Sequence, residues 1–178
     1  ADFGPANVVF LYPADGVPRA LWVAPVGEPL PAGPALSTEV WQWGEVRSGI
    51  ATITAPVVEA FVPQMLNYES VGGVNFKKGC YPGQEVVARS QFRGTLKRRA
   101  FLVHSETAML AGQEVFAESD DSQPAATVAQ AAAAPAGGFD AIISGQVAAI
   151  ESSPLRLGSA TGPLLMLDAL PYALLADI

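Results

Sequence analysis

The sequence predicts an α+β protein whose second half is a small all-β domain. Glycine and proline account for 17 and 15 of its 178 residues, a content that favours many turns and few long helices. From residue 97 onward, short apolar runs alternate with turn residues, which is the pattern of a small antiparallel β-domain. We therefore divide the chain into a first domain, residues 1–96, and a second domain, residues 97–178.

The first two dozen residues predict a β-hairpin. Residues 8–12 and 20–24 are apolar runs typical of strands. Residues 13–16 between them form a turn, in which Gly16 readily adopts a positive φ. The proline-rich residues 25–35 that follow predict a loop.

The rest of the first domain mixes extended and short helical segments. We interpret residues 40–53 as extended, which places Trp41 and Trp43 on one face of a strand because their spacing is two. Residues 61–68 predict one short helical turn, limited by Pro63. A second helix is predicted to start near residues 81–85, because Pro82 suits a first turn and Glu85 complements the positive helix end.

The second domain is predicted to consist of short strands. The alanine-rich residues 119–138 could form a helix, but a turn at 135–138 favours strand, turn, strand. The predicted strands are residues 99–104, 114–118, 127–133, 139–144, 155–157 and 164–168.

Charge is distributed unevenly along the chain. Net charge is −7, yet seven of the ten basic residues lie between Lys77 and Arg99, opposed there only by Glu85. This strip is a candidate site for an anion, although a solvated helix face would look the same. No apolar run approaches the ~20 residues of a membrane span, so we expect no membrane partner. The single cysteine and the lack of an export signal favour a cytoplasmic location.

Residues 76–85, with the sequence FKKGCYPGQE, carry the chemistry that the sequence suggests. Cys80 follows a glycine and precedes a helix start, where backbone N–H groups and nearby lysines favour the thiolate. Lys78 is the candidate cation that poises it. The alternative is a buried structural cysteine, which the Lys, Gly and Pro neighbours disfavour.

The same segment closely resembles the YgfZ family of folate-binding relatives of the glycine-cleavage T-protein. Its core, KGCYPGQE at residues 78–85, matches the specific signature of that family, and the resemblance is strongest over residues 41–99. It implies the latter half of a T-protein-like folate domain, built from ferredoxin-like pieces, followed by a small antiparallel β-barrel. Since the chain begins ADFG without a Met, we expect the N-terminal part of that domain to be absent from it.

The resemblance also implies a function: a folate-dependent accessory role in the assembly or repair of iron–sulfur proteins, including enzymes that modify tRNA. The expected cofactor is tetrahydrofolate or another reduced folate, and the expected partners are iron–sulfur client proteins and folate. Cys80 and Lys78 are then the candidate reactive thiol and its cation. The candidate folate-binding residues are Trp41, Tyr81, Gln84, Glu85, Arg93 and Lys97.

Two alternative functions remain open. A T-protein-type aminomethyltransferase would be an enzyme, but T-proteins carry a pterin-binding Glu where this chain has Arg47, and a cation cannot accept N–H donors. A tRNA-binding module would use the basic strip, and its binding would depend strongly on salt. His104 lies in a predicted strand, and we expect it to be a surface or satisfied core residue.

Overall fold

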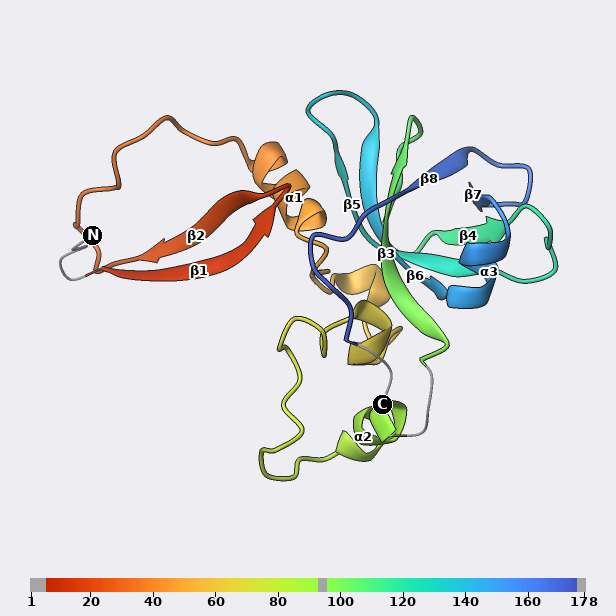
Figure 1. Cartoon of the computed structure of the whole chain (residues 1–178). Coiled ribbons are helices and arrows are strands. Elements are labelled where there is room, and N and C mark those ends of the chain that lie inside the picture. Colours follow the sequence, from red (N-terminus) through yellow and green to blue (C-terminus); the bar gives the residue numbers. More distant parts are fainter. Residues whose placement is uncertain (1–5, 93–95, 176–178) are drawn as a thin grey trace.

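The computed structural model describes residues 6–92 and 96–175, which form an α+β fold with a closed β-barrel (Figure 1). The first half holds the following elements: β1 (Asn7–Ala14), β2 (Val17–Val23), α1 (Thr38–Arg47), the 3₁₀ helices η1 (Ala55–Val57) and η2 (Pro63–Leu66), and α2 (Gln84–Phe92). The second half holds β3 (Arg98–Ser105), β4 (Glu114–Ala117), β5 (Ala126–Ala133), β6 (Phe139–Gln146), α3 (Val147–Ser152), β7 (Leu155–Leu157) and β8 (Leu164–Asp168).

The second half confirms the predicted barrel. Its six strands close in the order β3-β6-β5-β4-β7-β8, and all the pairings within it are antiparallel. Each of the six predicted strands is present, with ends that agree within two residues. The short helix α3 was not predicted. Among the described residues, no helix has the length and apolar character that crossing a membrane requires.

The barrel interior is one of two apolar cores. Side chains alternate between the two faces of a strand, so Val103 of β3 and Ile143 of β6 point inward and are fully buried. Small residues such as Ala126 and Ala141 fill the remaining space. The interior is therefore packed with side chains, as small barrels generally are.

The second core covers the outer face of β3, β5 and β6. Leu102 and Ile142 point outward from the barrel, and Val46 of α1 and Leu66 of η2 pack against them. This explains why β3 is buried on both faces. The core combines residues from both sides of the predicted boundary at residue 96, so the two halves pack together; the boundary itself stays a prediction.

Asn67 attaches the first half to the barrel through the backbone. It has φ 59, in the left-handed region that Asn tolerates. Its side-chain amide donates to the Ala100 carbonyl at 2.9 Å and accepts from the Ala100 N–H at 3.1 Å. A single buried side chain thus satisfies both backbone groups of one β3 residue.

The predicted hairpin is confirmed as β1 and β2. Its two-residue turn, Asp15 and Gly16, has φ values of 47° and 76°. Positive φ at both positions is the signature of a type I′ turn, for which Asp-Gly is a favoured sequence. The turn places the Asp15 side chain beside α1.

The prediction that residues 40–53 are extended was wrong, because residues 38–47 form α1. The tryptophan and β-branched residues favoured a strand locally, but the ends of the segment carry helix signals. Ser37 caps the first turn by accepting from the Val40 N–H at 3.3 Å, and Gly49 follows the helix with φ 70. Trp41 and Trp43 therefore lie about 200° apart around a helix axis and not on one face of a strand.

Helix α2 begins at Gln84, as the motif predicted, and lies well apart from α1 in Figure 1. The connection between η2 and α2 is a long loop that contains the motif. Whether residues 6–92 represent half of a T-protein-like domain stays a prediction.

Gly145 of β6 leads to a test of barrel packing. A Cβ at this position would lie 2.7 Å from the Ala126 Cβ on the paired strand and 2.5 Å from the Ile150 Cδ1. We expect Gly145→Ala to lower the free energy of unfolding by about 1–3 kcal/mol, because the Ala126 Cβ cannot move without its backbone. Gly79→Ala is the control, since nothing lies within 4 Å of its added Cβ. Equal denaturant midpoints for the two variants would contradict this packing.

Candidate functional site

The motif loop presents Cys80 at the surface. Cys80 is exposed, and Lys78 and Tyr81 flank it in an exposed loop. The Lys78 ammonium lies 4.8 Å from the centre of the Tyr81 ring, a cation–π contact. The Tyr81 N–H donates to the Gln84 Oε1 at 3.3 Å and so ties the loop to the first turn of α2.

These motif residues border a small cavity of about 180 Å³. Its lining comprises Val74, Asn75, Phe76, Lys78, Cys80, Tyr81, Gln84, Val87 and Ala88. The structure therefore brings four predicted site residues together: Lys78, Cys80, Tyr81 and Gln84. The cavity is mostly apolar and combines a thiol with an ammonium group, a setting in which a small anionic or thiol-bearing group could approach Cys80.

Trp41 lies at a different and larger cavity. This cavity, of about 440 Å³, is formed between the β1–β2 turn and α1, and Trp41, Trp43 and Val40 line its helix side. Arg19 lies over the Trp41 ring with its Cζ 5.0 Å from the ring centre. Its Nη2 is 2.7 Å from the Glu45 Oε1. The space and the aromatic wall suit a flat ring.

The remaining predicted folate-binding residues do not gather at either cavity. Glu85 is exposed on α2, and Lys97 is exposed just before β3. Neither borders the two cavities just described. Arg93 lies outside the described residues. Since α1 and α2 are well apart in Figure 1, Trp41 is not brought together with Tyr81 and Gln84.

The predicted basic strip is only partly a surface. Lys77, Lys78, Arg89 and Lys97 are exposed. Arg99 is buried and forms an ion pair of 2.9 Å with the buried Glu69, so it is not part of the exposed basic surface. The physical reason is that β3 is covered on both faces, and a charge there requires a buried partner.

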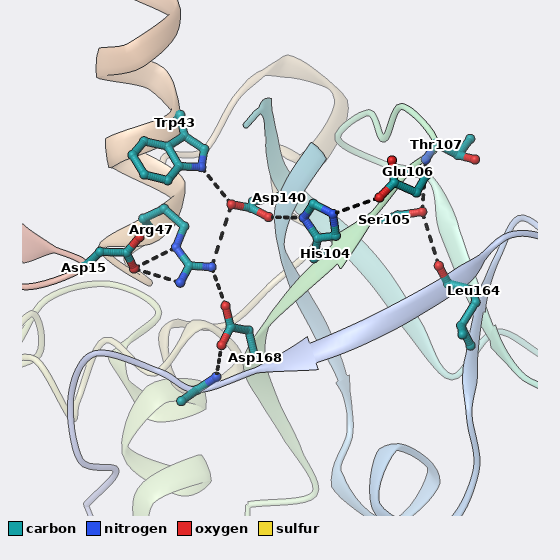
Figure 2. A network of polar contacts seen from close by, with 11 residues as sticks. Asp15, Trp43, Arg47, His104, Ser105, Glu106, Thr107, Asp140, Leu164 and Asp168 are labelled. Atoms are coloured by element: carbon teal, nitrogen blue, oxygen red, sulfur yellow. Dashed lines mark hydrogen bonds and ion pairs between the residues drawn. The ribbon is translucent and has the colours of Figure 1, made fainter. Parts of the chain in front are cut away.

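A polar network that the sequence did not predict joins the first half to the barrel (Figure 2). At its centre is Asp140 of β6, a buried carboxylate. Its Oδ2 accepts from the Trp43 Nε1 at 2.7 Å, and its Oδ1 lies 2.7 Å from the His104 Nδ1. His104 and Asp140 are directly opposite on β3 and β6, so the pair follows from strand register.

Arg47, at the end of α1, extends this network. Its Nε and Nη2 contact the Asp15 Oδ1 at 2.8 and 2.7 Å, and its Nη1 donates to the Asp168 Oδ2 at 2.6 Å. The Asp140 Oδ2 is 3.7 Å from the same Nη1. Burial lowers the pKa of Arg47, but hydrogen bonds to Asp15 and Asp168 outweigh it and raise that pKa above its usual range. One guanidinium thus ties the hairpin turn to β8 and approaches β6.

The network borders a third cavity, of about 350 Å³, on which Asp15, Trp43, Arg47, His104, Asp140 and Asp168 converge with residues 134–137. Sequence reasoning singled out Arg47 and His104 but missed the three aspartates. The alternation of side chains along a strand indicated part of this site. His104 is two residues from Leu102 and Asp140 is two residues from Ile142, so all four side chains lie on the outer face of the barrel. The register between the strands, which pairs them, was not readable from the sequence.

No group of three or more metal-ligating side chains occurs among residues 6–92 and 96–175. Cys80 is the single cysteine of this sequence. The motif loop therefore offers a single thiol ligand, which can hold a cluster only in an arrangement shared with a partner.

Comparisons with known proteins agree with the motif, although no protein-family model matches the chain. Over 138 residues it is 34% identical to the tRNA-modifying protein YgfZ of Edwardsiella ictaluri, covering 75% of this chain and 41% of that protein. The YgfZ of Colwellia psychrerythraea is 44% identical over 73 residues, 41% of this chain and 22% of the relative. The YgfZ of Aliivibrio fischeri is 38% identical over 78 residues, which are 43% of this chain and 24% of the relative.

The fold and motif define the class: an α+β chain in which a closed barrel follows a segment with an exposed Gly-Cys-Tyr loop. The chain belongs to the YgfZ family. It spans less than half the length of the curated relatives it matches.

The His104–Asp140 pair leads to a pH-dependent prediction. The hydrogen bond to Asp140 raises the pKa of His104 above 6.5, against a smaller opposing effect of burial. Because this pKa is raised in the folded state, the pair contributes fully to the free energy of unfolding below about pH 6.5. This contribution is lost as the pH rises through the folded-state pKa of His104. We expect wild type to be more stable than His104→Ala by about 1–3 kcal/mol at pH 6, because the variant leaves the buried Asp140 carboxylate without one of its donors.

Urea unfolding of both proteins between pH 5.5 and 8.5 would measure this difference. It should shrink toward high pH, and in an Asp140→Asn background its dependence on pH should weaken, since only Glu106 then remains beside the His104 Nε2. A difference that is constant across the range, or that grows with pH, would rule out the charged pair.

Proposed function

We propose that this protein binds a reduced folate and supports iron–sulfur proteins that modify tRNA. The printed names of its relatives, tRNA-modifying protein YgfZ, support the link to tRNA modification. The observation that carries the folate assignment is the 440 Å³ cavity with Trp41 on its wall. Trp41 is the residue that the family resemblance aligns with a folate-pocket tryptophan.

The size and lining of this cavity fit a flat ring of a folate. Val17, Pro18, Leu36 and Val40 offer apolar contacts, and Trp41 and Trp43 offer aromatic ones. Flat heterocycles stack well on such walls. Tetrahydrofolate or another reduced folate is therefore the ligand we propose, with its ring in this cavity.

Cys80 supplies the second part of the proposal. Its exposure makes the thiol accessible to a partner protein, and Lys78 lies in the same small cavity. The thiolate is the form of cysteine that binds metal and attacks electrophiles. In this role Cys80 contacts a cluster or thiol of an iron–sulfur client, and the cluster belongs to that client.

Two other functions are less well supported. An aminomethyltransferase of the T-protein type would require an acceptor where this chain has Arg47, whose guanidinium is engaged by Asp15 and Asp168. Direct tRNA binding would rest on the exposed lysines and Arg89, a smaller basic surface than the sequence suggested because Arg99 is buried. We therefore propose that tRNA is the substrate of the client enzymes and is not bound by this protein itself.

Folate binding can be tested on the Trp41 wall. We expect 5-formyltetrahydrofolate to bind the wild type, and Trp41→Ala to weaken the affinity about tenfold, the scale of losing one buried aromatic contact. Trp22→Ala is the matched control, because Trp22 lies on the hairpin but does not line the cavity. Isothermal titration calorimetry would measure all three. Equal losses in the two variants, or no binding to wild type, would count against the cavity as a folate site.

The role of the thiol can be tested in cells. A strain that lacks the protein would be complemented with wild type, Cys80→Ser, Lys78→Met or Lys77→Met. We expect the content of thiolated tRNA nucleosides to fall severalfold for Cys80→Ser and Lys78→Met, because the first removes the thiol and the second removes the charge that borders the same cavity. Lys77→Met removes the same charge from an exposed position outside the cavity and should retain the modification.

The activity of an iron–sulfur enzyme that does not act on tRNA would be measured in the same strains. Parallel loss of that activity would place the defect at iron–sulfur proteins. Full tRNA thiolation with Cys80→Ser would exclude the thiol from the function.

A further inference from the structure

The small cavity beside Cys80 is bordered by side-chain donors, of which the proposed function uses only Lys78. Besides the thiol, its polar side chains are those of Asn75, Lys78, Tyr81 and Gln84, and no acidic side chain is among the described residues that border it. Its volume of about 180 Å³ is below the ~300 Å³ at which pockets for drug-sized ligands begin. The cavity therefore suits a ligand of only a few heavy atoms and is too small for a whole folate.

Hydrogen bonds within the loop fix the two amide side chains at this cavity. The Asn75 Oδ1 accepts from the Lys77 N–H at 2.8 Å, and the Gln84 Oε1 accepts from the Tyr81 N–H at 3.3 Å. The acceptor end of each amide is thus held by the loop backbone, and its NH₂ end has no hydrogen bond to any residue of 6–92 and 96–175. An amide held in this way offers its N–H donors to a ligand.

Lys78 adds a positive charge to these donors. Its ammonium lies 4.8 Å from the centre of the Tyr81 ring, a contact that holds the group at the cavity without neutralising it. Within the part of the chain that the structure describes, Lys78 forms no ion pair, whereas four arginines each pair with a carboxylate: Arg19, Arg47, Arg99 and Arg156. The charge at the cavity is therefore available to an anion from outside the chain.

We propose that this cavity binds a small carboxylate, which Lys78 and the amide groups of Asn75 and Gln84 hold beside the Cys80 sulfur. An ionised carboxylate only accepts hydrogen bonds, so it matches a lining whose unused amide and ammonium groups are donors. Its bond to the ammonium is charge-assisted and belongs to the stronger class. A molecule anchored by its carboxylate has its other atoms next to the thiol, so the site selects which small molecules meet Cys80. This inference goes beyond the proposed function and does not depend on the folate cavity.

Alkylation with iodoacetate and iodoacetamide tests this site, because Cys80 is the single cysteine of the sequence. With either reagent the thiolate sulfur bonds to the CH₂ carbon and iodide leaves, but only iodoacetate carries a carboxylate. The ratio of the two rate constants, measured by mass spectrometry, cancels the ionised fraction of the thiol. We expect this ratio to be about three- to tenfold higher for the folded protein than for the urea-unfolded chain, the scale of a charged hydrogen bond that solvent partly screens.

Asn75→Asp and Gln84→Glu test the donors themselves. Each variant replaces the NH₂ by a carboxylate oxygen and keeps an oxygen that accepts from the loop backbone, so the loop is retained while the donor is lost. The ratio should fall to that of the unfolded chain. Lys77→Met is the matched control, because it changes the net charge by the same amount in the same loop but outside the cavity. Its ratio should stay within about twofold of wild type, since single exposed charges have small effects.

The outcomes separate the site from the general charge of the loop. A raised ratio in folded wild type that is lost in Asn75→Asp and Gln84→Glu but kept in Lys77→Met supports the assignment. A folded wild type whose ratio equals that of the unfolded chain would overturn it. So would a ratio that falls as far in Lys77→Met as in the cavity variants, because the preference would then come from the loop's charge and not from these donors. Neither result affects the tests of folate binding and tRNA thiolation.

Discussion

The buried carboxylate of Asp140 is the interaction on which the arrangement of this protein depends. A carboxylate removed from water requires hydrogen-bond donors that replace its hydration. Asp140 has them from Trp43 of α1 and His104 of β3, with the guanidinium of Arg47 close by. Because these donors belong to separate elements, the charge can be buried only when α1 lies against the outer face of the barrel.

This constraint also organises what lies around it. Beside Asp140, the outer face of β3 and β6 is apolar and packs against α1 and η2 through Leu102 and Ile142. The apolar contacts supply most of the attachment energy, while the directional hydrogen bonds fix the rotation of α1. Arg47, at the end of α1, binds Asp15 and so fixes the position of the hairpin turn relative to this helix. Asp15 lines both the Trp41 cavity and the cavity of the polar network, so the position of this turn shapes both cavities.

The sequence indicated those parts of the structure that local patterns control. The hairpin, the six barrel strands and the start of α2 each have their own turn residues and alternation. Helix α1 was misread, because Trp41, Trp43 and Val46 resemble a strand locally and the capping by Ser37 and Gly49 was overlooked. The Asp140 network could not be predicted, since Trp43 and Asp140 are 97 residues apart and strand register decides which side chains meet. The motif loop, by contrast, brings Lys78 and Tyr81 together over three residues.

The separation of the two candidate sites bears on how they could act together. Cys80 lies in the loop before α2, Trp41 lies on α1, and the two helices are well apart in Figure 1. A ring held against Trp41 does not contact the thiol in this arrangement. If both sites serve one function, the folate ring is then not the group that Cys80 attacks. The exposure of Cys80 instead leaves it open to a partner protein, so in the proposed function any coupling between the thiol and the folate passes through the body of the protein or through the partner. Trp43 borders the Trp41 cavity and donates to Asp140 of β6, so the polar network is a direct contact between this cavity and the barrel.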